Sequence, residues 1–279
     1  MEEARQFFKF LDIITNSFLE TLRTNLSRKN DISELSLFFV FSFGRSGTQF
    51  FSKLLNSDPK ALIFHEPLKR DVLEHMKSFK EGYDYDLYIK KFRIKFIQSI
   101  IKLNNSNREI KVYGECNSYL RRHAGAIMSL LPNVKGLYVI RDGRNVVRSM
   151  MSRSVMLDTW YYNNIKPKYD DPYFKKWGNW GRFEKCCWYW ASENKKLYKQ
   201  LGTAIQFELL LTDYDYFKSK MLDVLKIEIS KTLWENERKF KSANKTSLFK
   251  CPSYEDWPSP WKDSFWKICG NVMANNGYF

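Results

Sequence analysis

The sequence has few of the residues that build metal sites and disulfide frameworks. Five cysteines stand at uneven spacings among 279 residues, and the three histidines lie in no C-x-x-C or H-x-x-x-H pattern. We therefore expect reduced thiols and no metal. Long apolar runs are lacking as well, since no stretch approaches the ~18 consecutive apolar residues of a membrane-spanning helix. The chain begins with MEEARQFF rather than with a basic segment and an apolar run. The sequence thus predicts a soluble, cytoplasmic protein without a transmembrane segment.

Acidic residues are outnumbered by basic ones. The chain carries 46 Lys and Arg against 31 Asp and Glu, a net charge of +15, which suits an anionic cofactor or substrate, nucleic acid or an anionic membrane surface. The lysines are spread along the whole length, so we expect most of them to form a solvated surface. Aromatic and basic residues mix between 154 and 182, but no known nucleic-acid-binding module is present. We expect no nucleic-acid partner.

Length and composition predict one globular domain. Its 44% hydrophobic and 17% aromatic residues can fill a sizeable core. No internal repeat or linker divides the chain. An amphipathic stripe near the start predicts a helical extension over 1–36, followed by the core over 37–279.

The stretch 37–55, LFFVFSFGRSGTQFFSKLL, is the part around which the rest is organised. Its first five residues, 37–41, are apolar and predict a strand buried on both faces. A turn with two glycines follows, and from Thr48 apolar residues recur on one face of a helix. This geometry brings free backbone N–H groups and the positive end of a helix to one place, where a phosphate or sulfate can bind. The predicted anion-binding residues of this motif are Gly44, Arg45, Ser46, Gly47, Thr48 and Gln49.

The motif differs from the nucleotide-binding loop of ATPases and GTPases. That loop needs a Lys after its second Gly, where this chain has Thr48. Hydrolysis of nucleoside triphosphates is therefore disfavoured. The loop contains Arg45 instead, whose planar guanidinium suits the anionic oxygens of a transferring group.

Further apolar runs alternate with helical patterns along the chain. Strands are predicted over 61–64, 110–113, 136–140 and 203–207, and helices over 119–131, 183–201 and 216–225, with a last helix ending near Asn275. The charged, helical segment 69–103 is predicted to be a lid or a substrate-facing insertion. This alternation predicts a doubly wound α/β fold with a central, mostly parallel sheet flanked by helices. Ligands bind outside the carboxyl ends of the strands in such sheets, so the titratable residues that follow the strands are candidates: His65, Glu66 and Glu115.

Two elements taken together, SFGRSGTQFFSKLL and LYVIRDGRNVVRSMMSR, resemble the sulfotransferase family that uses 3′-phosphoadenosine 5′-phosphosulfate (PAPS). The first is similar to the family's 5′-phosphosulfate loop, in which Arg or Lys precedes S-G-T. The second is similar to its 3′-phosphate motif, an Arg at a strand end with a Ser eight residues on, here Arg141 and Ser149. Weaker similarity through GECNSYL, FEKCCWYWASEN and FWKICGNVMANNGY matches bacterial members and extends over most of residues 37–278.

The resemblance implies a P-loop NTPase-like sulfotransferase architecture. It also implies transfer of a sulfuryl group from PAPS to an acceptor hydroxyl or amine by in-line displacement, with adenosine 3′,5′-bisphosphate as product and no metal. Arg45 would stabilise charge at the transferring group. Two positions depart from the family pattern: many relatives have Lys at the position of Cys116, so Lys245 or another base is expected to replace it, and Gly143 stands where Pro is frequent.

An acceptor hydroxyl attacks sulfur well only if a general base removes its proton. His65 and Glu66 both qualify by position, and alternation along a strand predicts that one of them faces the donor. Relatives that use Glu as the base place it at the end of the strand after the loop helix, as Glu66 is placed here. We therefore predict Glu66 as the base, with Glu115 as the alternative.

Two other function classes stay open at this point. One is a P-loop phosphotransferase or kinase, which Mg²⁺-dependent ATP binding would favour. The other is a non-catalytic protein that binds nucleic acid or lipid through its basic and aromatic surface. Within the sulfotransferase reading, a lipid, a glycan and a small metabolite all remain possible acceptors.

Overall fold

A five-stranded, entirely parallel sheet forms the centre of the molecule. The computed structural model describes Ile32 and residues 35–105, 109–157, 164–239 and 247–279. The strands are β1 (Ser36–Ser42), β2 (Ala61–His65), β3 (Val112–Cys116), β4 (Val134–Ile140) and β5 (Ile205–Gln206), and their order across the sheet is β2-β3-β1-β4-β5. The predicted α/β class with a central parallel sheet is confirmed.

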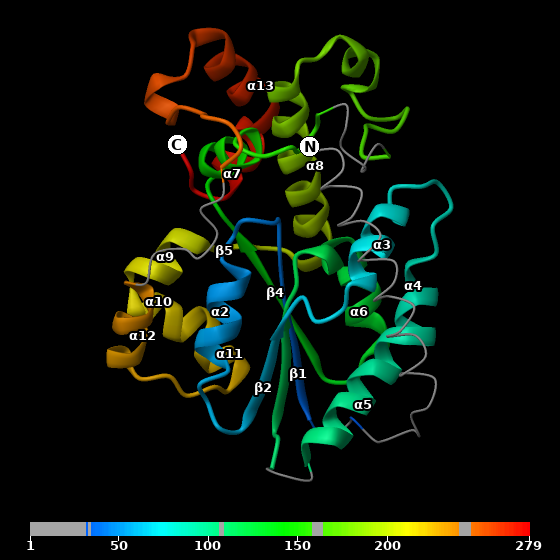
Figure 1. Cartoon of the computed structure of the whole chain (residues 1–279), viewed down its shortest axis with the longest axis vertical. Coiled ribbons are helices and arrows are strands. Elements are labelled where there is room, and N and C mark those ends of the chain that lie inside the picture. Colours follow the sequence, from blue (N-terminus) through cyan, green and yellow to red (C-terminus); the bar gives the residue numbers. More distant parts are fainter. Residues whose placement is uncertain (1–31, 33–34, 106–108, 158–163, 240–246) are drawn as a thin grey trace.

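Helices connect the strands and cover both faces of the sheet (Figure 1). They are α2 (Thr48–Leu55), α3 (Arg70–Lys77), α4 (Tyr85–Tyr88), α5 (Ile94–Asn105), α6 (Ala124–Leu130), α7 (Gly143–Met151), α8 (Arg182–Leu201), α9 (Phe207–Thr212), α10 (Tyr214–Phe217), α11 (Asp223–Leu225), α12 (Lys231–Arg238) and α13 (Ser259–Asn275). Short 3₁₀ segments are η2 (Tyr119–His123), η3 (Phe174–Asn179) and η5 (Tyr254–Asp256), and π-helical turns are η1 (Ile89–Arg93) and η4 (Lys218–Leu222).

The alternation of side chains along β1 builds two cores. Leu37, Phe39 and Phe41 point to the face covered by α5, α6 and α8. Phe38 and Val40 point to the opposite face, where α2 and the helices after β5 pack. In Figure 1, α2 and α9 to α12 lie on one side of the sheet and α3 to α6 on the other, while α7 and α13 lie beyond the carboxyl ends of the strands. The carboxyl ends of the strands therefore point toward α7 and α13.

The segment 69–103, predicted as a lid or insertion, contributes to the core. Ile89, Phe92, Ile97 and Ile101, from η1 and α5, are buried in the cluster on the α8 face of the sheet. The apolar stripe of this segment is thus a surface that packs against the core.

Every strand differs from its predicted bounds by one to three residues, and the differences at β3 and β5 affect candidate residues. β3 runs over Val112–Cys116 rather than 110–113, because Gly114 lies inside the strand. A Cβ atom at Gly114 would stand 2.1 Å from the Phe38 ring, so this glycine admits a ring from β1 and does not end the strand. β5 has two residues, Ile205–Gln206, and the chain turns at once into α9, so Glu208 is helical. The helices predicted over 183–201 and up to Asn275 are confirmed as α8 and α13.

Several predictions lie outside the described residues. These are the N-terminal amphipathic helix, part of the aromatic segment after 157, and Lys245. Within the described ranges, none of the helices is long and apolar enough to cross a membrane.

Candidate functional site

The turn between β1 and α2 has the backbone of an anion cradle. Arg45 and Gly47 have φ angles of 78° and 75°, in the left-handed region. A Cβ atom at Gly47 would lie 2.3 Å from the Phe207 ring, so both its conformation and its surroundings require glycine. Gly47 is also the N-cap residue of α2 and supplies no side-chain cap. The positive end of α2 therefore faces the turn, where the helix dipole would stabilise a bound anion.

Two residues far along the chain join this turn. The Arg141 Nη1 atom, at the end of β4, donates to the Arg45 carbonyl oxygen at 2.7 Å. The Arg45 Nε atom donates to the Ser149 Oγ atom of α7 at 3.1 Å. Asp142 caps α7 by accepting from the Arg144 N–H at 2.8 Å, and this N-cap directs the helix away from the strand end. Arg45, Arg141 and Ser149 thus meet at the carboxyl ends of β1 and β4.

This region accumulates positive charge away from water. Burial lowers the pKa of Arg45, and the charges of Arg153 and Arg141 lower it further. Burial also lowers the pKa of Arg141, more than Glu208 and the other acidic neighbours restore it. The Ser46 Oγ and Arg141 Nε atoms are buried and, among the residues described, have no hydrogen-bond partner. A phosphate or sulfate group bound here would supply hydrogen-bond partners for these atoms and neutralise the charge of the arginines.

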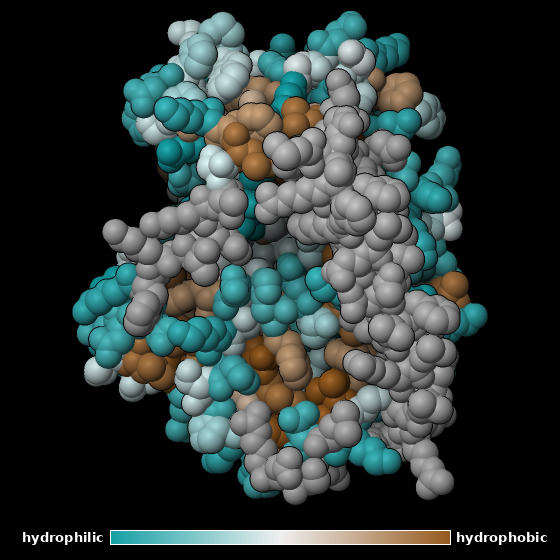
Figure 2. Space-filling view, viewed as in Figure 1, coloured by the Kyte–Doolittle hydropathy of each residue, from teal (hydrophilic) through white to brown (hydrophobic). Residues whose placement is uncertain are grey.

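The surface reflects this arrangement. Figure 2 shows hydrophilic residues over α2 and a hollow directly above them, toward the strand ends.

His65 and Glu66 lie on the other side of the same turn. The His65 Nε2 atom is 3.0 Å from the Thr48 Oγ1 atom at the start of α2, and 3.9 Å from the Glu66 Oε2 atom. Glu66 has a φ angle of 45°, which turns its backbone out of the strand conformation. The Ser118 N–H donates to its Oε1 atom at 3.3 Å, and the Ser118 hydroxyl donates to the same oxygen. Because the backbone turns at Glu66, the side-chain alternation of a regular strand does not hold here, and the His65 and Glu66 side chains are not directed to opposite faces of the sheet.

Glu115, the alternative base, has a different environment. It lies within β3 and is fully buried, where it accepts hydrogen bonds from Arg93 and, at 2.6 Å, from the Tyr113 hydroxyl. Arg93 also donates to both oxygens of Asp71, at 2.9 and 3.0 Å. This carboxylate is enclosed by an interior ion network, which leaves no access for an acceptor.

The two departures from the family pattern also have structural settings. Cys116 is fully buried in the core on the α2 face, where burial raises the pKa of its thiol well above the ordinary value. Gly143 packs against Trp190, and a Cβ atom there would stand 2.9 Å from the indole ring. A proline at 143 would need Trp190 to move. Lys245, the proposed replacement for the missing lysine, lies outside the described residues.

Sequence reasoning missed two polar residues of this region. Ser118, in the GECNSYL motif, binds Glu66, and Arg121, one 3₁₀ turn later, donates to the Ser118 carbonyl oxygen at 2.6 Å. The motif marked the right stretch of chain. Nothing in the local pattern assigns these contacts, because Ser118 and Glu66 are 52 positions apart.

Comparisons with known proteins add a likeness of fold. No protein-family model matches the chain, and no curated protein matches it. Among solved structures, a sulfotransferase from Mycobacterium avium matches with a TM-score of 0.53 and 10% identity, over 88% of this chain and 78% of that one. A sulfotransferase from Alicyclobacillus acidocaldarius matches with 0.49 and 15%, over 89% and 98%. A sulfotransferase domain from the curacin biosynthetic pathway matches with 0.44 and 13%, over 88% and 98%. The first of these likenesses shows that the chain shares the fold of the Mycobacterium avium sulfotransferase.

Proposed function

We propose that this chain is a PAPS-dependent sulfotransferase of the bacterial type. The observation that carries the proposal is the meeting of Arg45, Arg141 and Ser149 at the glycine turn. These are the residues that the two sequence motifs assign to the two anionic ends of the donor. The shared fold with a sulfotransferase is consistent with it.

The residues present fit the donor. Ser46 and Arg141 offer buried polar atoms without partners among the described residues, and the positive end of α2 faces the same turn. We assign the 5′-phosphosulfate to the turn 44–49 and the 3′-phosphate to Arg141 and Ser149. PAPS supplies the sulfuryl group, and Arg45 stabilises the charge that develops at the group in transfer.

Glu66 acts as the general base in this proposal. Its Oε1 atom is occupied by Ser118, and its Oε2 atom is the one nearer His65. A carboxylate held beside the anion cradle accepts the proton of the attacking hydroxyl or amine as the new bond to sulfur forms. The acceptor is a lipid, a glycan or a small metabolite. We propose a cytoplasmic location and no metal requirement.

Thermal unfolding with nucleotides tests the donor assignment. Adenosine 3′,5′-bisphosphate at ~100 times its dissociation constant adds about 2.7 kcal/mol to the free energy of unfolding, and adenosine 5′-monophosphate should add much less. A screen of hydroxyl and amine acceptors with radiolabelled PAPS then identifies the product. Stabilisation by Mg²⁺-ATP, with no response to the bisphosphate, would favour a phosphotransferase instead.

A further inference from the structure

Ser118 is held on both sides of its backbone. Its N–H and hydroxyl donate to the Glu66 Oε1 atom, and its carbonyl oxygen accepts from the Arg121 Nη1 atom at 2.6 Å. Ser118 is 5% exposed and lies beside the glycine turn, since a Cβ atom at Gly44 would be 3.9 Å from its Oγ atom. The position of the Glu66 carboxylate therefore depends on a residue that Arg121 holds.

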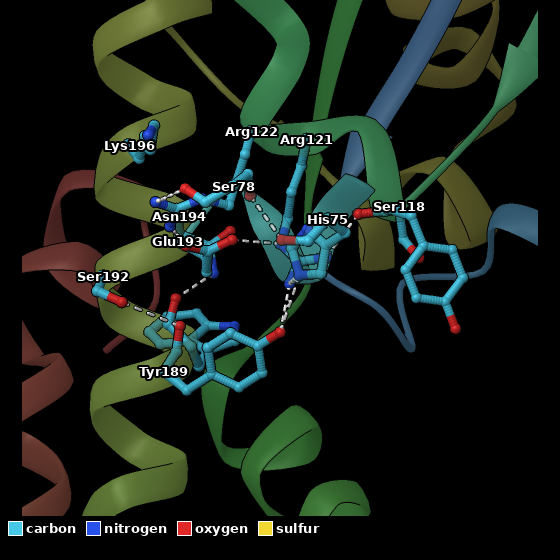
Figure 3. Close-up of polar contacts among 12 residues, drawn as sticks. His75, Ser78, Ser118, Arg121, Arg122, Tyr189, Ser192, Glu193, Asn194 and Lys196 are labelled. Atoms are coloured by element: carbon cyan, nitrogen blue, oxygen red, sulfur yellow. Dashed lines mark hydrogen bonds and ion pairs between the residues drawn. The ribbon is translucent and has the colours of Figure 1, made fainter. Parts of the chain in front are cut away.

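Arg121 is itself held by a buried cluster at α8 (Figure 3). Its Nε atom donates to Glu193 at 2.7 Å, and its Nη2 atom donates to the Tyr189 hydroxyl at 2.6 Å and to the His75 Nε2 atom at 2.8 Å. Its guanidinium carbon also lies 4.9 Å from the centre of the Phe43 ring, the residue just before the turn. With its guanidinium bound in this way, Arg121 has little freedom to move.

The charges of the cluster are stable near neutral pH. Burial opposes ionisation of Glu193, but Arg122 and Arg121 outweigh it and lower its pKa. Burial likewise opposes the charge of Arg121, but Tyr189 and Glu193 outweigh it and raise its pKa. Burial, followed by Arg121 and Arg122, holds the pKa of His75 well below its ordinary value, so its ring is neutral and accepts from Arg121. A hydrogen-bonded cluster whose protonation does not change near neutral pH can hold a neighbouring residue in a fixed position.

We propose that Arg121 is a positioning residue for Glu66. Acting through Ser118, it keeps the Glu66 Oε1 atom occupied and leaves the Oε2 atom for the acceptor's proton. The inference rests on the proposed function, in which Glu66 is the general base. Arg121 touches neither donor nor acceptor in this arrangement, so its effect passes through the Ser118 backbone.

The neighbouring arginine provides a matched control. The Arg122 side chain is 10% exposed, and its Nη1 atom pairs with the same Glu193 carboxylate at 2.5 Å. Its Nη2 atom donates to a serine carbonyl, that of Ser78, at 3.1 Å, and its guanidinium carbon lies 3.8 Å from the centre of the Phe79 ring. Ser78, however, donates to the carbonyl of His75 and not to a residue of the candidate site. The two arginines share Glu193, but Arg121 holds the serine that donates to Glu66 and Arg122 holds Ser78.

Kinetics of Arg121→Lys and Arg122→Lys separate positioning from general stabilisation. We expect Arg121→Lys to lower kcat by ~10- to 100-fold with the KM for PAPS unchanged, because a small misplacement of a reacting group has effects of this size. Arg122→Lys should keep the wild-type kcat. In a Glu66→Gln background, Arg121→Lys should cause no further loss. Equal losses for the two arginine variants, or losses that multiply in the Glu66→Gln background, would overturn the proposal.

A second measurement does not depend on donor or acceptor. His65 lies 3.9 Å from Glu66, so its ring resonances in NMR spectra report movement of that carboxylate. They should shift in Arg121→Lys and in Ser118→Ala, a smaller change chosen in case the first variant unfolds, and stay in place in Arg122→Lys. Unchanged His65 resonances in a folded Ser118→Ala protein would refute the coupling. If the wild type fails to bind adenosine 3′,5′-bisphosphate, the proposed function is wrong, while this experiment still decides whether Arg121 positions Glu66.

Discussion

The arginines of this protein fall into two groups. In the interior, Arg93, Arg121 and Arg122 each contact a carboxylate, and each has a pKa above the ordinary value although burial opposes the charge. At the glycine turn, burial lowers the pKa of Arg45 and of Arg141. The Arg141 Nη1 atom donates to a backbone carbonyl there.

The difference separates arginines whose charge is stabilised by buried carboxylates from arginines whose charge is disfavoured by their surroundings. A buried charge is tolerated when a partner of opposite sign neutralises it. The interior arginines have that partner within the chain. At the turn, burial lowers the pKa of Arg45 and the charges of Arg153 and Arg141 lower it further, an effect that an incoming phosphate or sulfate would oppose. Four variants test this distinction, from the largest expected effect to the smallest.

Arg93→Met should have the largest effect because it leaves two buried carboxylates, Asp71 and Glu115, without their cation. Removing one partner of a buried ion pair costs about 3–5 kcal/mol, so urea denaturation should show a loss of that size or an unfolded protein. Lys90→Met is the matched control on the same segment. Lys90 is 56% exposed and pairs with Asp86 at 3.3 Å, a type of surface pair that contributes about 0–1 kcal/mol. Equal losses for the two variants would remove the contrast between interior and surface.

Glu66→Gln should lower turnover by ~10²-fold or more while leaving the binding of adenosine 3′,5′-bisphosphate intact. The amide oxygen can still accept from Ser118, so shape is preserved and only the base is lost. Steady-state transfer from PAPS and calorimetric binding of the bisphosphate measure the two properties separately. Wild-type turnover in Glu66→Gln, with loss in His65→Ala, would move the role of base to the imidazole.

Arg141→Ala should weaken binding of adenosine 3′,5′-bisphosphate far more than binding of adenosine 5′-monophosphate. A hydrogen bond between charged groups contributes about 1.5–3 kcal/mol, and the monophosphate lacks the 3′-phosphate that would receive it. Arg144→Ala, three residues further along the chain in the first turn of α7, is the control because Arg144 pairs with Asp142 at 2.7 Å. Equal weakening of both nucleotides in Arg141→Ala would indicate a role in holding the turn through the Arg45 carbonyl.

Local pattern was sufficient for the frame of the fold. Buried apolar runs, glycines at the turn and a helical stripe after Thr48 predicted the order of elements and placed the candidates at the strand ends. The end of β3 was predicted too early because a glycine after an apolar run is typical of a strand end. Gly114 instead lies inside the strand, where it leaves room for the Phe38 ring.

Contacts between distant residues were beyond such reasoning. Arg121 pairs with Glu193 across 72 positions, and Arg93 reaches Glu115 across 22. Glu115 follows a predicted strand just as Glu66 does, so the local pattern alone makes them equivalent candidates, and only the resemblance to the family favoured Glu66. Packing distinguishes them independently, since Glu115 is enclosed by the interior network and Glu66 borders the turn.

The smallest expected effect is a pH dependence of the interior group. Burial, with the charges of Arg122 and Arg93, lowers the pKa of His123 from 6.5 to about 3. The unfolded chain therefore binds a proton at His123 as pH falls below 6.5 and the folded chain does not, so stability is lost as pH falls from 6.5 toward 3. Between pH 7 and pH 5.5 this histidine should contribute a loss of about 1 kcal/mol.

His123→Gln tests the effect, because glutamine does not titrate and its side-chain amide N–H can still donate to the Tyr83 hydroxyl oxygen, which lies 2.9 Å from the His123 Nε2 atom and donates its own proton to Glu74. Urea unfolding at pH 5.5 and pH 7 should show that the variant loses about 1 kcal/mol less than the wild type over this interval. Between pH 7 and pH 8 the free energy of unfolding of the two proteins should change with pH in the same way. An unchanged pH dependence in His123→Gln would mean that burial and the charges of the interior arginines do not keep this ring neutral, and the contrast between the two groups of arginines would lose one of its supports.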